Sequence, residues 1–352
     1  MKVIRDRLAL PGGTSARQVI GITGGSGYIG SNLAKRFSQD FDVKLLDLVP
    51  PKIELPTSVS FEKCDITDYV SVEEQLRDVD LVVHTAIIQI PRILQEKSLA
   101  FRVNIEGTEN VARAVNLLNR PKAMLLTSSW HTIGERGLNG VVSESFGYRP
   151  DKVEERARLY TLSKIVQESV VRFYDETSEK TYGVIRMGTV LGENMPHDTA
   201  ANLFIEKGLK GEPLTPFKHS AYRPMFFVDI NDIAKAYVSF AERILDGRIP
   251  PSHDSSLHII NVYLPQPITV LELANIVART IGHVTEGKIH PLVTVVDKGI
   301  DSPFTTEDKD RVWGDMRKAR DYLFAEPKIT VEESIERIVR SRLSEQKILV
   351  PG

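Results

Sequence analysis

The sequence predicts an α/β fold, a doubly wound parallel sheet with helices on both faces and a smaller C-terminal domain. Short apolar runs alternate with amphipathic stretches through the first half of the chain, as strands and helices do in such folds. A glycine cluster joins the first apolar run to the first amphipathic stretch. Beyond residue 192 the alternation stops, and proline and glycine punctuate the chain. With 352 residues, 41% of them hydrophobic, the chain can bury a sizeable core.

The charge balance excludes several classes of partner. The chain has 45 basic and 47 acidic residues, a net charge of −2 and no long block of one sign, so neither nucleic acid nor anionic membrane binding has electrostatic support. Cys64 is the sole cysteine, which excludes an intrachain disulfide and favours a buried structural thiol in a reducing compartment. No apolar run approaches the length of a membrane span, and the N-terminus lacks the apolar core of a signal peptide. We therefore expect a cytoplasmic protein.

Residues 19–31, VIGITGGSGYIGS, predict the first strand, a tight turn and the start of the first helix. Their glycines fit the dinucleotide-binding fingerprint when it is started at Gly25, and its variant with glycine at every third position when it is started at Gly24. In both readings no Cβ blocks the turn, and backbone amides at the positive end of a helix can face a pyrophosphate. The expected contacts are Gly24, Gly27, Tyr28, Ile29 and Gly30.

An acidic residue about 20 positions after such a turn is the second part of the fingerprint. Residues 43–47 predict a second strand that ends in Asp47. This carboxylate can accept hydrogen bonds from both hydroxyls of an adenosine ribose, and it would repel a 2′-phosphate. No arginine follows in residues 48–51. The sequence therefore predicts NAD rather than NADP as the cofactor.

Residues 59–63 predict the third strand, which leads to Asp65 and Ile66. Asp65 then lies at the carboxyl end of a strand, close to the place expected for the adenine of the cofactor. A role as N-cap of the helix expected around residues 72–76 accounts for Asp65 equally well, and the two roles are compatible. We place Asp65 and Ile66 among the expected cofactor contacts.

The apolar run 81–86 predicts a fourth, fully buried strand. Thr85 and Ala86 at its end are small and allow a dinucleotide to approach closely. A helix is expected from about residue 99 to 118, and it carries Asn104. Because this helix should pack on the sheet, Asn104 must find hydrogen-bond partners. These three residues complete the expected cofactor contacts.

The candidate catalytic residues follow the next strand. Residues 123–126 are apolar and lead into Thr127, Ser128 and Ser129. Tyr160 and Lys164 are four positions apart and therefore share one face of a helix. Such a pair is common by chance, but here it comes after a dinucleotide fingerprint and a strand that ends in serine.

On these residues the chain resembles the extended short-chain dehydrogenase/reductase superfamily, which comprises the nucleotide-sugar epimerases and dehydratases with a Rossmann cofactor domain. The resemblance runs from the glycine turn almost to the C-terminus. It rests on residues 103–108, the set Ser129, Tyr160 and Lys164, and residues 182–186, 228–234, 314–320 and 326–328.

The resemblance implies a role for each catalytic residue. Tyr160 would exchange a proton with a substrate hydroxyl while a hydride passes to NAD, and Ser129 would hold the oxygen as it becomes a carbonyl. An unperturbed tyrosine titrates near pH 10, so it needs a neighbouring cation to act as a base. Lys164 would be that cation and would also bind the nicotinamide ribose. The insertion 135–159 carries a charged stretch at 151–158 and is expected to border the substrate.

Residues 201–214 and Arg223 resemble the part of sugar epimerases that binds the nucleotide diphosphate. Asn202 and Arg223 are accordingly expected to bind the substrate, with the forked guanidinium of Arg223 on a phosphate. A structural ion pair is the alternative role for Arg223. Two departures oppose a nucleotide sugar: Thr189 stands where those epimerases carry asparagine, and residues 301–308 contain no arginine for a second phosphate.

Two activities therefore stay open. The first is an epimerase or dehydratase of nucleotide sugars that recycles its NAD. The second is a dehydrogenase that oxidises a free sugar acid, or another small secondary alcohol, and releases NADH, because residues 128–134 resemble the matching run of uronate dehydrogenases. A protein of this fold that binds NAD without catalysis is a third, less favoured hypothesis, since all three catalytic residue types are present.

The expected domain organisation has four parts. Residues 1–17 form an N-terminal extension and residues 346–352 a tail. The NAD-binding domain is expected to comprise residues 18–190 and 226–263, and the substrate-binding domain residues 191–225 and 264–345. We expect a homodimer that takes a small-molecule substrate and holds no metal.

Overall fold

The computed structural model describes residues 17–349, and side chains up to residue 345. The expected N-terminal extension therefore lies outside the described residues, except for Arg17. Of the expected tail, only the backbone of residues 346–349 is described, as the end of α10 (Val331–Leu349).

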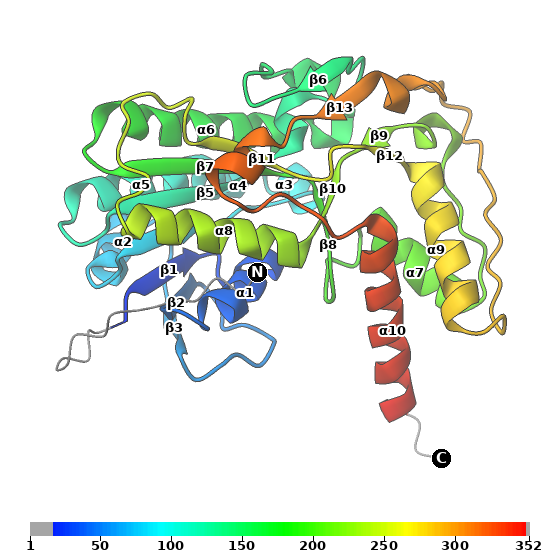
Figure 1. Ribbon diagram of the computed structural model, residues 1–352, viewed down its shortest axis with the longest axis horizontal. Coiled ribbons are helices and arrows are strands. Elements are labelled where there is room, and N and C mark those ends of the chain that lie inside the picture. The colour runs from blue at the N-terminus through cyan, green and yellow to red at the C-terminus, as the bar shows by residue number, and fades with distance from the viewer. Residues whose placement is uncertain (1–16, 350–352) are drawn as a thin grey trace, which may run out of the picture.

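The core of the protein is a seven-stranded sheet in the order β11-β7-β5-β4-β1-β2-β3, with all neighbours parallel (Figure 1). Its strands are β1 (Val19–Thr23), β2 (Asp42–Asp47), β3 (Val59–Lys63), β4 (Leu81–His84), β5 (Ala123–Ser129), β7 (Thr181–Met187) and β11 (Ile259–Val262). The strand order reverses between β1 and β4, and in such sheets ligands bind outside the carboxyl ends of the strands at the reversal. The predicted doubly wound parallel sheet is confirmed.

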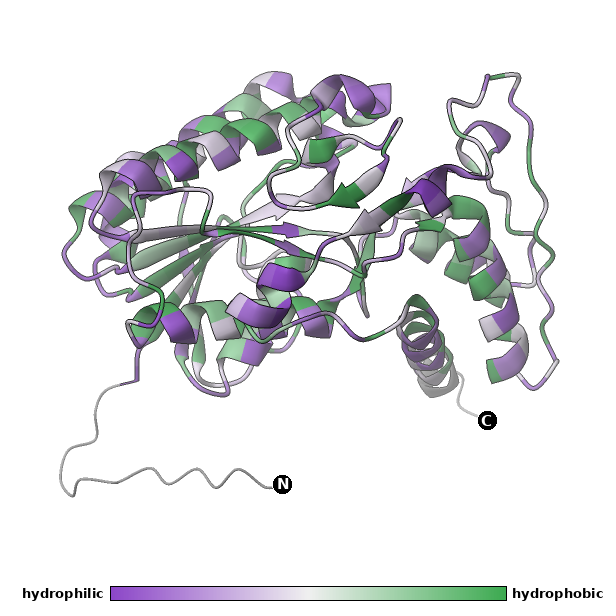
Figure 2. Cartoon of the chain, turned by 45° about the horizontal axis from the view of Figure 1, so that its top comes forward, coloured by the Kyte–Doolittle hydropathy of each residue, from purple (hydrophilic) through white to green (hydrophobic). Residues whose placement is uncertain are grey.

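Helices cover both faces of this sheet. On one face α1 (Tyr28–Phe37) packs against α8 (Ile230–Leu245), and on the other α5 (Gly107–Leu117) packs against α2 (Tyr69–Leu76) and α6 (Arg158–Thr177). Figure 2 shows the strands running between the helix layers. Successive side chains of each strand point to opposite faces of the sheet, so both faces contribute to a core. Ile20 and Ile22 belong to the α1/α8 core, while Val82 and Met124 belong to the α2/α5 core.

The expected helix from about residue 99 to 118 is interrupted. The chain forms the short helices α3 (Arg92–Gln95) and α4 (Lys97–Phe101), and a π-helical segment at Arg102–Glu106 joins α4 to α5. Asn104 lies fully buried within that segment, and its side chain bonds a loop rather than its own helix. π-Helical turns within α-helices are frequent at functional sites.

The remaining segments gather beside the sheet, where α7 (Ala200–Leu209), α9 (Val270–Val284) and α10 lie together (Figure 1). Three small sheets accompany them: β8 (Thr189–Leu191) with β10 (Phe227–Asp229), β9 (Pro224–Met225) with β12 (Ile268–Thr269), and β6 (Gly140–Val142) with β13 (Val312–Gly314). β11 lies in the main sheet. This agrees with its assignment to the expected cofactor domain. The division of the chain into two domains stays a prediction.

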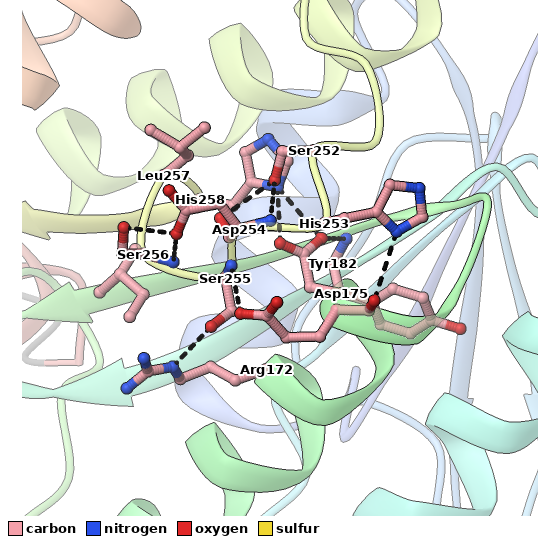
Figure 3. A network of polar contacts seen from close by, with 12 residues as sticks. Arg172, Asp175, Tyr182, Ser252, His253, Asp254, Ser255, Ser256, Leu257 and His258 are labelled. Atoms are coloured by element: carbon pink, nitrogen blue, oxygen red, sulfur yellow. Dashed lines mark hydrogen bonds and ion pairs between the residues drawn. The ribbon is translucent and has the colours of Figure 1, made fainter.

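A buried polar network fixes α6 to the strands at the edge of the sheet (Figure 3). His258 Nδ1 lies 3.1 and 3.0 Å from the two carboxylate oxygens of Asp175. The same carboxylate accepts the backbone N–H of Tyr182 at 2.8 Å. Arg172 Nε donates to Ser255 Oγ at 3.0 Å. The helix that carries Tyr160 and Lys164 near its beginning is thus attached near its end to β7 and to the segment before β11.

Candidate active site

The turn after β1 has no room for a side chain at two of its glycines, Gly24 and Gly30. Gly24 has φ +68°, and a Cβ there would lie 2.5 Å from the backbone of Ala86. A Cβ at Gly30 would lie 2.7 Å from the carbonyl oxygen of Gly24. α1 begins directly after Gly27, and no side chain caps it. Its first N–H groups have no intrahelical partner, so the turn offers uncapped donors to an anion, as a dinucleotide pyrophosphate requires.

Asp47 at the end of β2 lies beside this turn. One of its carboxylate oxygens accepts the backbone N–H of Ser26 at 3.1 Å, and the other accepts the N–H of Leu48 at 2.7 Å. Each oxygen retains a lone pair, because an ionised carboxylate has about four acceptor positions. The structure therefore brings together the two parts of the fingerprint, and these residues fit the adenosine end of NAD.

Of the two roles open for Asp65, the N-cap role is wrong. Asp68 caps α2 by accepting the N–H of Val70 at 3.1 Å. Asp65 Oδ1 instead accepts the N–H and hydroxyl of Thr67, at 2.9 and 2.8 Å, in a turn. This shorter local turn occurs because an Asp can bond the backbone two residues on. Ile66 is buried, and a Cβ on Gly107 would meet its Cδ1 at 2.7 Å.

Thr85 and Asn104 position the backbone beside the glycine turn. Thr85 Oγ1 lies within 2.8 Å of the Thr23 carbonyl and 3.0 Å of the Gly24 carbonyl, so it holds the glycine turn on β4. Asn104 accepts the N–H of Ile88 at 2.7 Å and donates to its carbonyl at 3.1 Å. These two hydrogen bonds fix the loop after β4 at Ile88. A direct contact of either residue with the cofactor stays a prediction.

The three candidate catalytic residues meet at the end of β5. Lys164 is buried and donates to the Thr127 carbonyl at 2.6 Å. Its ammonium lies 6.0 Å from the centre of the Tyr160 ring. Burial raises the pKa of Tyr160 to about 12, against a hydrogen bond from Ser129 that lowers it. Burial lowers the pKa of Lys164 to about 7, against the charge of Glu168 that raises it.

Glu168 is a residue of the site that our sequence analysis missed. It is fully buried and pairs with Arg186 at 2.8 Å. Ser128 Oγ donates to its Oε1 at 2.5 Å. The helical spacing of Lys164 and Glu168 was the available signal, since residues four apart share a face. This pair anchors α6 to β5 and β7 beneath the ammonium.

Arg223 lies against the insertion between Ser129 and Tyr160. Its Nη1 is 2.7 Å from Glu154 Oε1 and 3.8 Å from Glu135 Oε1, and its side chain is 8% exposed. Although burial alone would raise the pKa of Glu154, Arg223 and Arg156 hold it below its ordinary value. The structure thus shows the ion pair that was the alternative role for Arg223. Its contact with a phosphate stays a prediction.

Asn202 lies on α7 and is fully buried. Its side-chain amide donates to Glu206 at 3.1 Å, and Arg342 of α10 donates to its oxygen at 3.3 Å. Among the described residues, its side-chain hydrogen-bond partners therefore lie on α7, on α10 and, at His197, in the loop before α7, and not in the catalytic set. Its contact with a substrate stays a prediction.

A cavity of about 920 Å³ lies near the β7/β11 edge of the sheet, and none of the predicted site residues lines it. Of the cations that line this cavity, Arg186 is buried and pairs with Glu168, and Lys318 donates to three backbone carbonyls.

Within residues 17–349 no group of three or more His, Cys, Asp or Glu side chains is arranged to hold a metal. In the same part of the chain no helix is long and apolar enough to cross a bilayer.

The parallel sheet with its glycine turn has the architecture of the short-chain dehydrogenase/reductase class. A profile of the NAD dependent epimerase/dehydratase family matches residues 20–252. The chain belongs to this family, which confirms the predicted family, the predicted enzyme class and NAD as the cofactor.

Similar proteins include sugar-nucleotide enzymes. A putative UDP-glucose 4-epimerase of Methanocaldococcus jannaschii is 26% identical over 90% of this chain and 96% of its own. UDP-glucuronic acid decarboxylase 1 of Arabidopsis thaliana is 24% identical over 93% of this chain and 72% of its own. The structure of UDP-glucuronic acid 4-epimerase from Bacillus cereus, with UDP-glucuronic acid and NAD, has a TM-score of 0.73 at 20% identity, covering 92% of this chain and 100% of that one. This likeness supports the fold.

The position of Asp47 leads to a prediction about cofactor choice. NAD should bind more tightly than NADP, because a carboxylate beside the ribose repels a 2′-phosphate. Asp47→Ala should narrow this difference roughly tenfold, since about 1.4 kcal/mol of repulsion corresponds to that factor. Calorimetric titration of both cofactors into both proteins measures the effect. Equal affinity of the unmutated protein for NAD and NADP would contradict it.

Proposed function

We propose that the protein is a sugar-modifying enzyme of the epimerase/dehydratase type that acts on a nucleotide sugar with tightly held NAD. The observation that carries the proposal is the meeting of Ser129, Tyr160 and Lys164 at the carboxyl end of β5. The bound NAD would supply reversible hydride acceptance. The names of the relatives, which include a UDP-glucose 4-epimerase and a UDP-glucuronic acid decarboxylase, support a nucleotide sugar as substrate.

Each catalytic residue has one task in this proposal. Tyr160 takes the proton from the substrate hydroxyl and later returns it. Its raised pKa makes it a poor base by itself, so the charge of Lys164 must favour the phenolate. Ser129 donates a hydrogen bond to the substrate oxygen. Lys164 also holds the nicotinamide ribose.

The substrate diphosphate would bind at Arg223 in this proposal. The guanidinium suits a phosphate, but its nearest partner is now Glu154 at 2.7 Å. A phosphate must therefore replace Glu154, and the free energy of separating that ion pair reduces its affinity. The insertion would border the substrate through this pair.

This competition gives a second prediction. Glu154→Gln should tighten binding of UDP to the NAD-loaded protein by about 3- to 10-fold, since roughly 1 kcal/mol of ion-pair attraction no longer opposes the phosphate. Calorimetric titration with UDP measures it. Glu155→Gln, an exposed neighbour in the same turn, is the matched control and should bind UDP like the unmutated protein. Equal affinities for all three proteins would show that Arg223 does not receive the phosphate.

The second candidate is a dehydrogenase of a free sugar acid or another small secondary alcohol, which would release NADH. The observation in its favour is that two carboxylates, Glu154 and Glu135, already face Arg223, so that a diphosphate has no free cation there. Thr189, in place of the asparagine of sugar epimerases, also favours it. A homodimer and a cytoplasmic location remain parts of our proposal.

A substrate screen distinguishes these functions. UDP-glucose, UDP-glucuronic acid and free glucuronic acid are each incubated with the protein and NAD. Products are analysed by chromatography, while absorbance reports reduced nicotinamide. The proposal predicts a new nucleotide sugar without accumulation of NADH. NADH formed in proportion to free glucuronic acid would favour the dehydrogenase, and no conversion of any of the three would count against both.

A further inference from the structure

His131 is a residue of the site to which the roles above assign nothing. It lies two positions after Ser129, in a 3-10 turn at Trp130–Ile133. Its Nδ1 is 3.0 Å from Ser129 Oγ. Its ring meets the ring of Tyr160 edge to face, with the ring centres 6.1 Å apart. His131 thus contacts both residues that are expected to handle the substrate oxygen.

The hydrogen bonds of Ser129 can be counted. A serine hydroxyl has one proton to donate and two lone pairs. The backbone N–H of His131 already donates to Ser129 Oγ, with 3.3 Å between nitrogen and oxygen. If Nδ1 of the ring carries a proton, it fills the second lone pair, and the Ser129 proton is left for another acceptor. If Nδ1 is bare, the Ser129 proton goes to the ring, and Ser129 can only accept from its other neighbours.

The surroundings keep the ring neutral, so the two tautomers are real alternatives. Burial and the charge of Arg223 lower the pKa of His131 to about 3. The other charged groups near the His131 ring are Glu154 and Arg156. The titratable side chain of Tyr160 packs against the His131 ring edge to face. The proposed role of Ser129, to donate a hydrogen bond to the substrate oxygen, requires its hydroxyl proton to point away from the His131 ring. Only the tautomer with a proton on Nδ1 permits this.

We propose that His131 is a positioning residue: its Nδ1–H donates to Ser129 Oγ and thereby leaves the Ser129 hydroxyl proton free to point toward the substrate oxygen. His131 makes and breaks no bond in this role, and it does not take up the transferred proton. The direction of the hydrogen bond between His131 and Ser129 can be measured without substrate. Only its effect on turnover rests on the proposed function.

The tautomer can be measured directly. The NAD-loaded protein is labelled with ¹⁵N in its histidine rings, and the shifts of the two ring nitrogens are recorded from pH 6 to 8. The His131 signals are assigned, among those of the eight histidines, by their loss in His131→Gln. We expect a neutral ring with the proton on Nδ1. A proton on Nε2, or a ring that becomes charged in this range, would overturn the proposal whatever the substrate is.

Kinetics test the consequence. With the substrate found among UDP-glucose, UDP-glucuronic acid and glucuronic acid, His131→Ala should lower kcat about 10-fold and change KM less, because one orienting hydrogen bond is lost. In a Ser129→Ala background the same substitution should cost almost nothing. His131→Asn should recover much of the loss, because its shorter amide can donate from the place of Nδ1.

Each outcome of the kinetic experiment has a different meaning for the proposal. An equal loss in both backgrounds would show that His131 acts on the substrate without Ser129, and the proposal would fail. If His131→Ala does not fold, as judged by its thermal unfolding and NAD affinity, the comparison of His131→Asn with His131→Gln takes its place, since only the former offers a donor near Nδ1. If the unmutated protein converts none of the three compounds, the proposed function fails, and the ¹⁵N measurement still decides the role of His131.

Discussion

Tyr160→Phe is expected to lower turnover at least 100-fold and to leave NAD affinity nearly unchanged. Positioned acid/base groups typically contribute about 10²–10⁴-fold to rate. The substitution removes only the oxygen that transfers the proton, while the ring that packs near Lys164 and His131 remains. Steady-state kinetics at several NAD concentrations measures both effects.

Tyr174→Phe is the matched control for this prediction. Tyr174 also lies on α6, but its hydroxyl bonds Glu109 at 3.0 Å, away from the catalytic set. It should keep full turnover. If Tyr160→Phe kept near-full turnover as well, the proton would have another acceptor, and Glu154 and Glu155 of the insertion would be the next residues to test.

Lys164→Met should impair both turnover and NAD binding, because one ammonium is expected to favour the phenolate and to hold the ribose. We expect turnover to fall at least 100-fold and NAD affinity to fall about 10-fold, the latter corresponding to roughly 1.4 kcal/mol. Kinetics with NAD titration measures both. Lys122→Met, at an exposed lysine, is the control and should change neither. Loss of turnover with unchanged NAD affinity would exclude the ribose contact.

The same variant should gain stability at neutral pH. Burial lowers the pKa of Lys164 from 10.5 to about 7, so the unfolded chain binds the extra proton between these pH values. The free energy of unfolding of the unmutated protein should therefore rise with pH from about 7 to 10.5, by at most about 1.4 kcal/mol per pH unit from this group. Lys164→Met should lack that contribution. Urea unfolding of both proteins across this range would contradict the account if their difference did not change with pH.

The elements that local sequence determines were predicted well. The run from Val19 through the glycine turn could be placed because a buried strand, a turn without Cβ atoms and an uncapped helix start all leave local signals. Asp47 was chosen as the acidic residue of the fingerprint because it lies about 20 positions after that turn. The interruption of the helix at Asn104 could not be predicted, and neither could the partner of the Asn104 side chain, Ile88, which lies in a loop whose course the sequence does not show.

Contacts between distant segments were beyond the sequence. The pairing of Arg223 with Glu154 joins residues 69 positions apart. An ion pair of Arg223 was considered only as an alternative, and its partner was not predicted. The role of His131 depends on which of its ring atoms reaches Ser129, and only the three-dimensional geometry gives that. Likewise, only Asp65 was considered as the N-cap of α2, and the course of the loop shows that Asp68 fills that position.

The fate of the substrate hydrogen tests the central proposal most directly. UDP-glucose deuterated at its ring carbons is incubated with the NAD-loaded protein and excess free NAD, and sugar and cofactor are analysed by mass spectrometry. The proposal predicts a converted nucleotide sugar that keeps the deuterium transferred as hydride, no deuterium in the free cofactor, and loss of conversion in Tyr160→Phe. Deuterium accumulating in free NADH in proportion to oxidised sugar would contradict the recycling of NAD at this site.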